Sequence, residues 1–307
     1  MNFFFLGVIG LLSFSCAIAT RQTDQLVKDF SPLPSNSKLA DVPLVKQASY
    51  HCGPASLSMA MQQAGREVSF TELNSQVLTP HAKGSFKTDM LASIRRQGML
   101  AIAVKDLKSI LSEVSSGRAV IVFQNLGLSW WPRWHYAVVT GYDFSGPDII
   151  LHTGDKSFLK TDMRIFERSW ILGGHWAYVI LSPGEISTSA SERIHAEAAS
   201  QLETIGKNDE AQKAYESMFV RWPESLPILI GLGNVSFTKK QFKESVYYLE
   251  KATSLHPLSA IAWHNLAFAQ EAEGKKWAAQ KSALKAIEMA DEEVIQLYRE
   301  SLKDLLP

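Results

Sequence analysis

The chain of 307 residues contains only two cysteines, Cys16 and Cys52. Two cysteines cannot build a disulfide framework or a cysteine-based zinc site, and the sequence implies no metal and no organic cofactor. Neither sign of charge is in excess, because 31 Lys and Arg residues balance 31 Asp and Glu residues. No basic cluster interrupts this balance. The sequence therefore gives no support for nucleic-acid binding.

Long apolar runs are also scarce, and the run at residues 3–14 is too short to span a bilayer comfortably. Small residues follow it, which predicts a signal peptide over residues 1–19. Cleavage after Ala19 would release a soluble chain, whereas cleavage before Cys16 would leave a lipid anchor on that cysteine. Ser13 stands where lipoprotein signals usually carry Leu, and an uncleaved anchor is the third alternative. We expect an exported protein of the periplasm or cell envelope that meets the membrane only through this segment.

The rest of the composition is that of a folded protein, with 46% hydrophobic residues, and the length predicts about two domains. Polar residues with little periodicity predict a linker at 20–41, and small polar residues predict a second linker at 184–191. Between them, residues 42–183 place helices first and an antiparallel sheet afterwards. This order predicts an α+β domain.

Hydrophobic periodicity and turn residues locate the elements of this domain. Helices are expected near residues 54–64, 68–73 and 87–97, and between Asp106 and Gly117. Strands are expected at 100–104, 119–123, 135–142, 149–153 and 176–181. The strands at 135–142 and 149–153 are separated by a turn at 143–148, which is typical of a β-hairpin.

Residues 192–307 follow a period of 34 residues. Trp222-Pro223 returns as His256-Pro257, and small residues recur in phase where two helices would cross closely, at Ala211, Ser245 and Ala279. This pattern resembles the tetratricopeptide repeat, with about three repeats and a capping helix over 292–306. Such an array offers a concave groove for a peptide or a partner protein.

One stretch of the first domain carries the elements of nucleophilic catalysis. Cys52 lies at the start of a predicted helix, and Pro54 suits the first turn of that helix. The positive end of the helix dipole is expected to lower the pKa of the thiol and favour the reactive thiolate. The alternative is a buried structural cysteine.

A thiol nucleophile also needs a base and donors for the oxyanion. His135 opens a hydrophobic strand, so a sheet can hold it rigidly, whereas the other histidines considered fit surface or packing roles. Gln47 could donate its side-chain N–H to the developing oxyanion, together with the backbone N–H of Cys52.

These motifs, Gln47 with Cys52-Gly-Pro-Ala and His135-Tyr-Ala-Val-Val with Gly141-Tyr-Asp, resemble the C39-like cysteine peptidases, a papain-like family. The resemblance covers about residues 42–182. It implies that Cys52 is the nucleophile, His135 the general base and Gln47 the oxyanion residue. The combination of such a domain with tetratricopeptide repeats resembles the bacterial members of this family that carry a signal peptide.

The third catalytic position departs from the family, which usually places an Asp-Pro at the end of the strand after the histidine strand. Hairpin register puts Thr153 at that position, and Asp155 offers a carboxylate two residues later. A threonine hydroxyl can hold an imidazole tautomer but cannot balance an imidazolium charge. Both residues therefore stay candidates for the group that orients His135.

Three functions are compatible with the sequence. The first is a cysteine peptidase that cleaves a protein or peptide recruited by the repeats. The second is a peptidase-like scaffold with weak or no catalysis that binds a partner protein. The third is another Cys/His amidase that acts on cell-wall peptides.

Overall fold

The computed structural model describes residues 18–46 and 50–306. The predicted signal peptide up to residue 17, with Cys16, and the predicted oxyanion residue Gln47 therefore lie outside the described residues. None of the helices described has both the length and the apolar character needed to cross a membrane.

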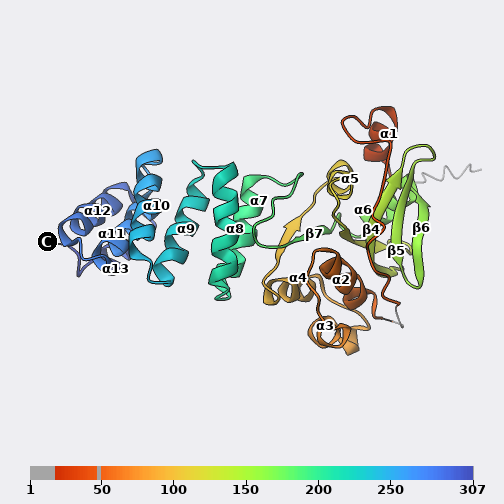
Figure 1. The fold of residues 1–307 in the computed structure, drawn as a ribbon, viewed down its shortest axis with the longest axis horizontal. Coiled ribbons are helices and arrows are strands. Elements are labelled where there is room, and N and C mark those ends of the chain that lie inside the picture. Colours follow the sequence, from red (N-terminus) through yellow and green to blue (C-terminus); the bar gives the residue numbers. More distant parts are fainter. Residues whose placement is uncertain (1–17, 47–49, 307) are drawn as a thin grey trace, which may run out of the picture.

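The N-terminal domain is an α+β unit, which confirms the predicted fold class (Figure 1). Its strands form one antiparallel sheet in the order β2-β7-β3-β4-β5-β6, and β1 pairs with β4 outside this path. The strands are β1 (Asn36–Lys38), β2 (Leu100–Ala103), β3 (Val120–Asn125), β4 (Trp134–Asp143), β5 (Asp148–Thr153), β6 (Lys156–Asp162) and β7 (Ala177–Leu181).

Local signals fix three of the predicted helices close to their expected bounds, whereas the helix expected at 68–73 lies over Phe70–Val77. In the structure the predicted helices are α2 (Cys52–Gln63), α3 (Phe70–Val77), α4 (Lys87–Arg96) and α5 (Leu107–Ser115). Ser69 caps α3 by accepting a hydrogen bond from the Glu72 amide at 3.1 Å, and Asp106 caps α5 in the same manner. Helix α2 packs against β3, β4, β5 and β7, so the predicted nucleophile lies beside the middle of the sheet.

The first predicted linker, residues 20–41, is instead folded onto the domain, and this prediction is corrected. It contains α1 (Arg21–Lys28) and β1, whose Asn36 pairs with Asp143 of β4. Thr23 is buried and donates from its backbone amide and its hydroxyl to Glu167, at 2.8 and 2.6 Å. Because Glu167 lies 144 residues from Thr23 in the sequence, a local reading of polar composition could not detect this contact.

Two further elements, β6 and α6 (Met163–Leu172), occupy a stretch in which no local pattern predicts a strand or a helix. Strand β6 is an edge strand whose side chains are mostly exposed, so it lacks a clear alternation of apolar residues. Asp162 ends the strand and caps α6 by accepting hydrogen bonds from the amides of Arg164 and Ile165.

The second predicted linker is held against the first domain by one buried carboxylate. An oxygen of Glu113 accepts hydrogen bonds from the hydroxyls of Ser187 and Ser189, at 2.6 and 2.7 Å, and from the Ser189 amide at 2.9 Å. The Ser187 amide donates to His195 of the first repeat helix at 3.0 Å. The segment therefore fastens the repeats to the first domain, and it does not act as a free tether.

The C-terminal part is a helical array with the predicted period. Its first helices begin at residues 192, 226 and 260, and its second helices at 208, 242 and 276, each 34 residues apart. The pairs are α7 (Glu192–Thr204) with α8 (Asn208–Arg221), α9 (Leu226–Thr238) with α10 (Phe242–Leu255), and α11 (Ala260–Ala272) with α12 (Lys276–Met289). The capping helix is shorter than predicted and forms α13 (Ile295–Ser301).

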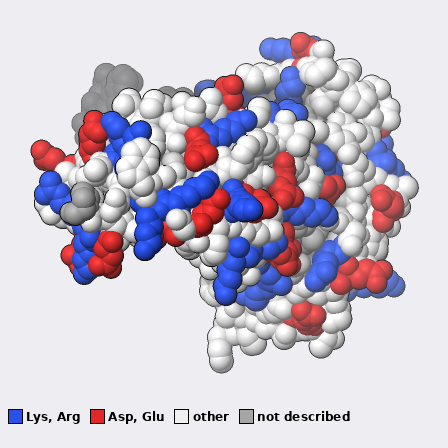
Figure 2. Space-filling model, turned by 60° about the vertical axis from the view of Figure 1, so that its left-hand side comes forward, with Lys and Arg blue, Asp and Glu red and all other residues white. Residues whose placement is uncertain are grey.

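The array extends from the first domain as a row of stacked helices (Figure 1). Helix α7 packs on β2, and its Ala199 and Leu202 belong to the same buried cluster as the sheet. On the face shown in Figure 2, positive and negative side chains are intermingled over both parts of the chain. Because Ala199 and Leu202 share the buried cluster of the sheet, the apolar core is continuous from the sheet into the first repeat.

Candidate active site

Cys52 is the first residue of α2, and the geometry of this helix start is set by its neighbours. The first intrahelical hydrogen bond runs from the Ala55 amide to the His51 carbonyl, at 3.1 Å. The amides of Cys52 and Gly53 precede it, so the helix offers them no partner. A Cβ atom on Gly53 would lie 2.3 Å from the hydroxyl oxygen of Ser85, so only glycine lets α2 approach that loop so closely.

His135 lies near the start of β4, and its imidazole is held by Thr153 at the end of β5. The Nε2 atom of His135 is 2.7 Å from the Thr153 hydroxyl oxygen. This contact leaves Nδ1 as the ring nitrogen available to a thiol. A neutral imidazole that accepts a proton at Nδ1 must donate from Nε2 to the Thr153 hydroxyl.

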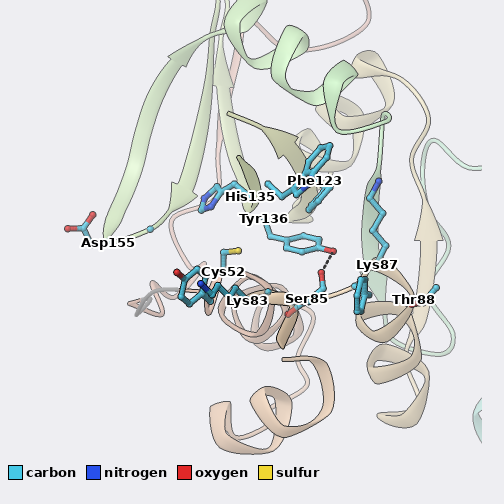
Figure 3. Close-up of a pocket in the computed structure, with 15 residues that line it drawn as sticks. Cys52, Lys83, Ser85, Lys87, Thr88, Phe123, His135, Tyr136 and Asp155 are labelled. Atoms are coloured by element: carbon cyan, nitrogen blue, oxygen red, sulfur yellow. Dashed lines mark hydrogen bonds between the residues drawn. The ribbon is translucent and has the colours of Figure 1, made fainter. Parts of the chain in front are cut away.

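The hairpin register explains why Thr153, and not Asp155, makes this contact. Val138 pairs with His152, and the same register carried further would bring Asp155 level with His135. Strand β5 ends at Thr153, however, and a two-residue turn with Gly154 at a φ of +62° starts β6. The side chain of Thr153, two residues before Asp155 in the chain, then lies on the same face of the sheet as that of His135. Asp155 is exposed, and its side chain points away from His135 (Figure 3).

Cys52 and His135 line the same pocket, which has a volume of about 850 Å³ (Figure 3). Aromatic side chains form much of its wall: Phe123 and Tyr136 within it, and Phe86 and Trp134, more than half exposed, at its rim. Tyr136 donates from its hydroxyl to the Ser85 carbonyl at 3.2 Å, so β4 and the loop before α4 are tied together below the thiol.

Two lysines line this pocket, Lys83 and Lys87, and the second of them is fixed in its wall. The ammonium group of Lys87 donates to the Gly173 carbonyl at 2.8 Å and lies 4.6 Å from the centroid of the Phe123 ring. Burial lowers the pKa of Lys87. The pocket thus combines an apolar surface with a fixed amine at some distance from the thiol.

The thiol and the imidazole are both held in their neutral forms by burial. Burial raises the pKa of the Cys52 thiol, and the backbone amides of Tyr136, Gly53 and Cys52 oppose this effect only in part. The predicted lowering by the helix start is therefore overridden by desolvation. Burial, followed by the nearby Arg133 charge, lowers the pKa of His135 below 6.5. At neutral pH the pair is a thiol beside an uncharged base.

Ser85 and Lys87 stand in no recognisable motif, and Tyr136, although it lies within the motif of His135, has no feature in the sequence that marks it as part of a pocket. The only signal in the sequence was position, since Tyr136 follows His135, Ser85 lies in the loop before α4 and Lys87 is the first residue of α4. Within the two described ranges, no group of three or more His, Cys, Asp or Glu side chains is arranged to hold a metal ion.

The role of Thr153 can be tested by supplying the missing carboxylate. In Thr153→Asp, an anion beside the ring is expected to raise the pKa of His135 by about 1–3 units, because it stabilises the imidazolium. The midpoint of the acid limb in a pH–rate profile should move up by the same amount. Thr153→Val, which removes only the hydroxyl, should lower turnover.

Asp155→Asn is the control for this series, because its side chain is exposed and directed away from His135. Its profile should superimpose on that of the wild type. A shift in the Asp155→Asn profile together with an unchanged profile in Thr153→Val would show that the carboxylate, and not the hydroxyl, orients the imidazole.

The fold and this pocket define a peptidase-like α+β domain with a cysteine and a histidine at its centre, followed by a tetratricopeptide-like array. The model of the Peptidase_C39 like family matches residues 39–177. The N-terminal domain of this chain therefore belongs to the C39-like family. A search among curated proteins gave no match.

Solved structures resemble each part of the chain separately. A protein described as a C39-like peptidase from Bacillus anthracis is 17% identical, with a TM-score of 0.41, and the match covers 48% of this chain and 98% of that one. MamA from Desulfovibrio magneticus RS-1 is 18% identical over 38% of this chain and 68% of its own, with a TM-score of 0.32. The first tetratricopeptide domain of Spaghetti (RPAP3), bound to an HSP90 peptide, is 18% identical over 36% and 93%, with a TM-score of 0.32.

Proposed function

We propose that this protein is an exported cysteine peptidase that cleaves peptide bonds in a protein or peptide, and that its repeat array recruits the substrate or a partner. The observation that carries the proposal is the shared pocket of Cys52 and His135, with the Nε2 atom of His135 held by Thr153. The apolar run at residues 3–14 supports the proposed export.

The chemistry is that of a thiol activated only during attack. His135 Nδ1 takes the proton of the Cys52 thiol while the sulfur bonds to the carbonyl carbon of the scissile peptide. The amides at the start of α2 stabilise the oxyanion, and Gln47 is the candidate for a further donor. The protonated His135 then gives its proton to the leaving amine. A water molecule, deprotonated by the same ring, hydrolyses the thioester and frees the thiol.

The shape of the pocket favours a substrate segment with an apolar side chain. Phe86 and Trp134 expose more than half of their surface at its rim, and Phe123 and Tyr136 continue this surface inward. Covering this surface with an apolar side chain of the substrate would remove it from water.

The test is hydrolysis of an unfolded, fluorescently labelled protein by wild-type enzyme and by Cys52→Ser. We expect cleavage by the wild type and a loss of nearly all of it in Cys52→Ser, because the hydroxyl is a far weaker nucleophile here. Cleavage of cell-wall muropeptides in place of unfolded protein would favour the amidase hypothesis. Equal hydrolysis by both forms would refute a cysteine peptidase.

A binding scaffold is the second candidate. Two observations favour it: the raised pKa of Cys52, and the presence of Thr153 where the family usually has a carboxylate. Under this hypothesis the wild type cleaves none of these substrates. It would still bind its partner protein, and Cys52→Ser would bind the partner with unchanged affinity.

A further inference from the structure

The repeat array contains two adjoining cavities that meet at one carboxylate. Cavities of about 410 and 350 Å³ share Glu203 of α7 and Asn234 of α9 in their linings. The second cavity continues to Asn265 and Phe268 of α11. Because α9 contacts both α7 and α11, the three first helices of the repeats line one continuous groove.

Glu203 is held in place by neutral donors. The hydroxyl of Tyr215 donates to its carboxylate at 3.2 Å, and the Asn234 side chain lies beside it as a second neutral polar group. The Asn265 amide group in turn donates to the Asn234 side-chain oxygen at 2.8 Å. These bonds orient the carboxylate but bring no opposite charge to it.

This carboxylate is the only formal charge of the groove within the described chain. None of the residues that line the two cavities is a Lys or Arg, and no described cation lies within 4.0 Å of Glu203. The group is half-buried, and desolvation disfavours its charge. A partly buried anion without a cation is costly, and a cation supplied by a ligand would offset this cost.

The walls beside Glu203 suit the stem of a long basic side chain. Leu226 and Ile230 line the first cavity, and Phe237 and Phe268 line the second. Lysine and arginine cover apolar surface with their methylene groups while the charged end reaches a polar partner. A carboxylate ligand would meet repulsion from Glu203 at the same place.

We infer that the groove of the repeat array binds a peptide segment through a lysine or arginine side chain paired with Glu203. This inference deepens the proposed recruiting role of the repeats, and it does not depend on catalysis by Cys52. It states the chemical class of the partner: a basic peptide with apolar flanks.

The experiment measures binding to the full chain carrying Cys52→Ser, so that no peptide is cut. The probes are three capped pentapeptides, Ala-Leu-X-Leu-Ala, in which X is lysine, norleucine or glutamate. By calorimetric titration, the lysine peptide should bind about tenfold more tightly than the norleucine peptide, because of one charge-assisted hydrogen bond. The glutamate peptide should bind most weakly.

Glu203→Gln keeps the shape of the side chain and should reduce the preference for lysine to less than twofold. Asn234→Asp adds a second anion to the groove and should strengthen binding of the lysine peptide, which keeps the test decisive if Glu203→Gln does not fold. Glu288→Gln, at a position on α12 that lines neither cavity, is the matched control and should change nothing.

Equal binding of the lysine and norleucine peptides overturns the inference, as does an unchanged preference in Glu203→Gln or no binding of any peptide. These outcomes concern the groove alone. If the wild type hydrolyses no substrate but the chain still prefers the lysine peptide, the peptidase proposal is overturned and the inference on the groove is not.

Discussion

In His135→Ala, turnover of a peptide substrate is expected to fall by about 10²- to 10⁴-fold, the range that a general base contributes. Burial keeps the Cys52 thiol protonated at neutral pH, so the sulfur needs an acceptor for its proton when it attacks. In the proposed mechanism His135 is that acceptor, because its imidazole is uncharged above its lowered pKa. Thr153 keeps the ring in place but cannot remove the proton.

The pH dependence of this effect distinguishes a base from a residue that only packs. The base is fully available above the lowered pKa of His135 and is lost as the pH falls through it, so the wild-type acid limb should lie below pH 6.5. His135→Ala should lack this limb. Its rate should instead rise with pH toward the raised pKa of the Cys52 thiol, because solvent must then take the proton.

Alkylation of Cys52 by iodoacetamide, followed by peptide mapping, measures the same proton transfer without a known substrate. At pH 7 the wild type should react faster than His135→Ala, and the two rates should converge only as the pH rises through the raised pKa of the Cys52 thiol, where it ionises unaided. His81→Ala, at an exposed histidine, is the control and should match the wild type. Identical rates of wild type and His135→Ala at pH 7 would contradict a role of His135 as base.

Glu113→Ala is expected to lower the free energy of unfolding by about 3 kcal/mol, because it leaves several donors without their acceptor. Glu113 is 0% exposed, and one of its oxygens accepts four hydrogen bonds from Ser187, Thr188 and Ser189. Its other oxygen pairs with Arg118 at 3.4 Å. The change should lower the midpoint of thermal unfolding by roughly 6–12 °C.

Circular dichroism gives the unfolding midpoint, and limited proteolysis shows whether residues 184–191 are released. Glu113→Ala should be cut faster in this segment, since its serines lose the contact that fastens them. Glu67→Ala removes an exposed carboxylate and should melt with the wild type. A midpoint of Glu113→Ala within 1 °C of the wild type would show that the segment is fastened by other contacts.

The repeat array could be predicted from the sequence almost in full. Its helices begin at intervals of 34 residues, as the spacing of Trp222-Pro223 and His256-Pro257 predicts. Each repeat packs mainly on its neighbours in the chain, so the information is local and recurs. The helix starts at Ser69 and Asp106 were predictable for the same reason, since a cap depends on residues three positions apart.

The errors of prediction fall where distant parts of the chain meet. Residues 20–41 have the composition of a linker, yet Thr23 is buried against Glu167 and β1 pairs with β4. Residues 184–191 also have a linker composition, but the carboxylate of Glu113 holds them. Polar residues of this kind gain order from partners that no local pattern contains.

The sequence by itself determined the candidates Cys52, His135, Thr153 and Asp155, and the order of helices, sheet and repeats. Only the tertiary structure decided between the last two, because the end of β5 at Thr153 and the turn at Gly154 carry Asp155 away from the ring. It also decided the direction in which the pKa of the Cys52 thiol departs from its ordinary value. The start of a helix favours a thiolate. Burial of Cys52 against the sheet, however, raises the pKa of the thiol more than the neighbouring backbone amides lower it.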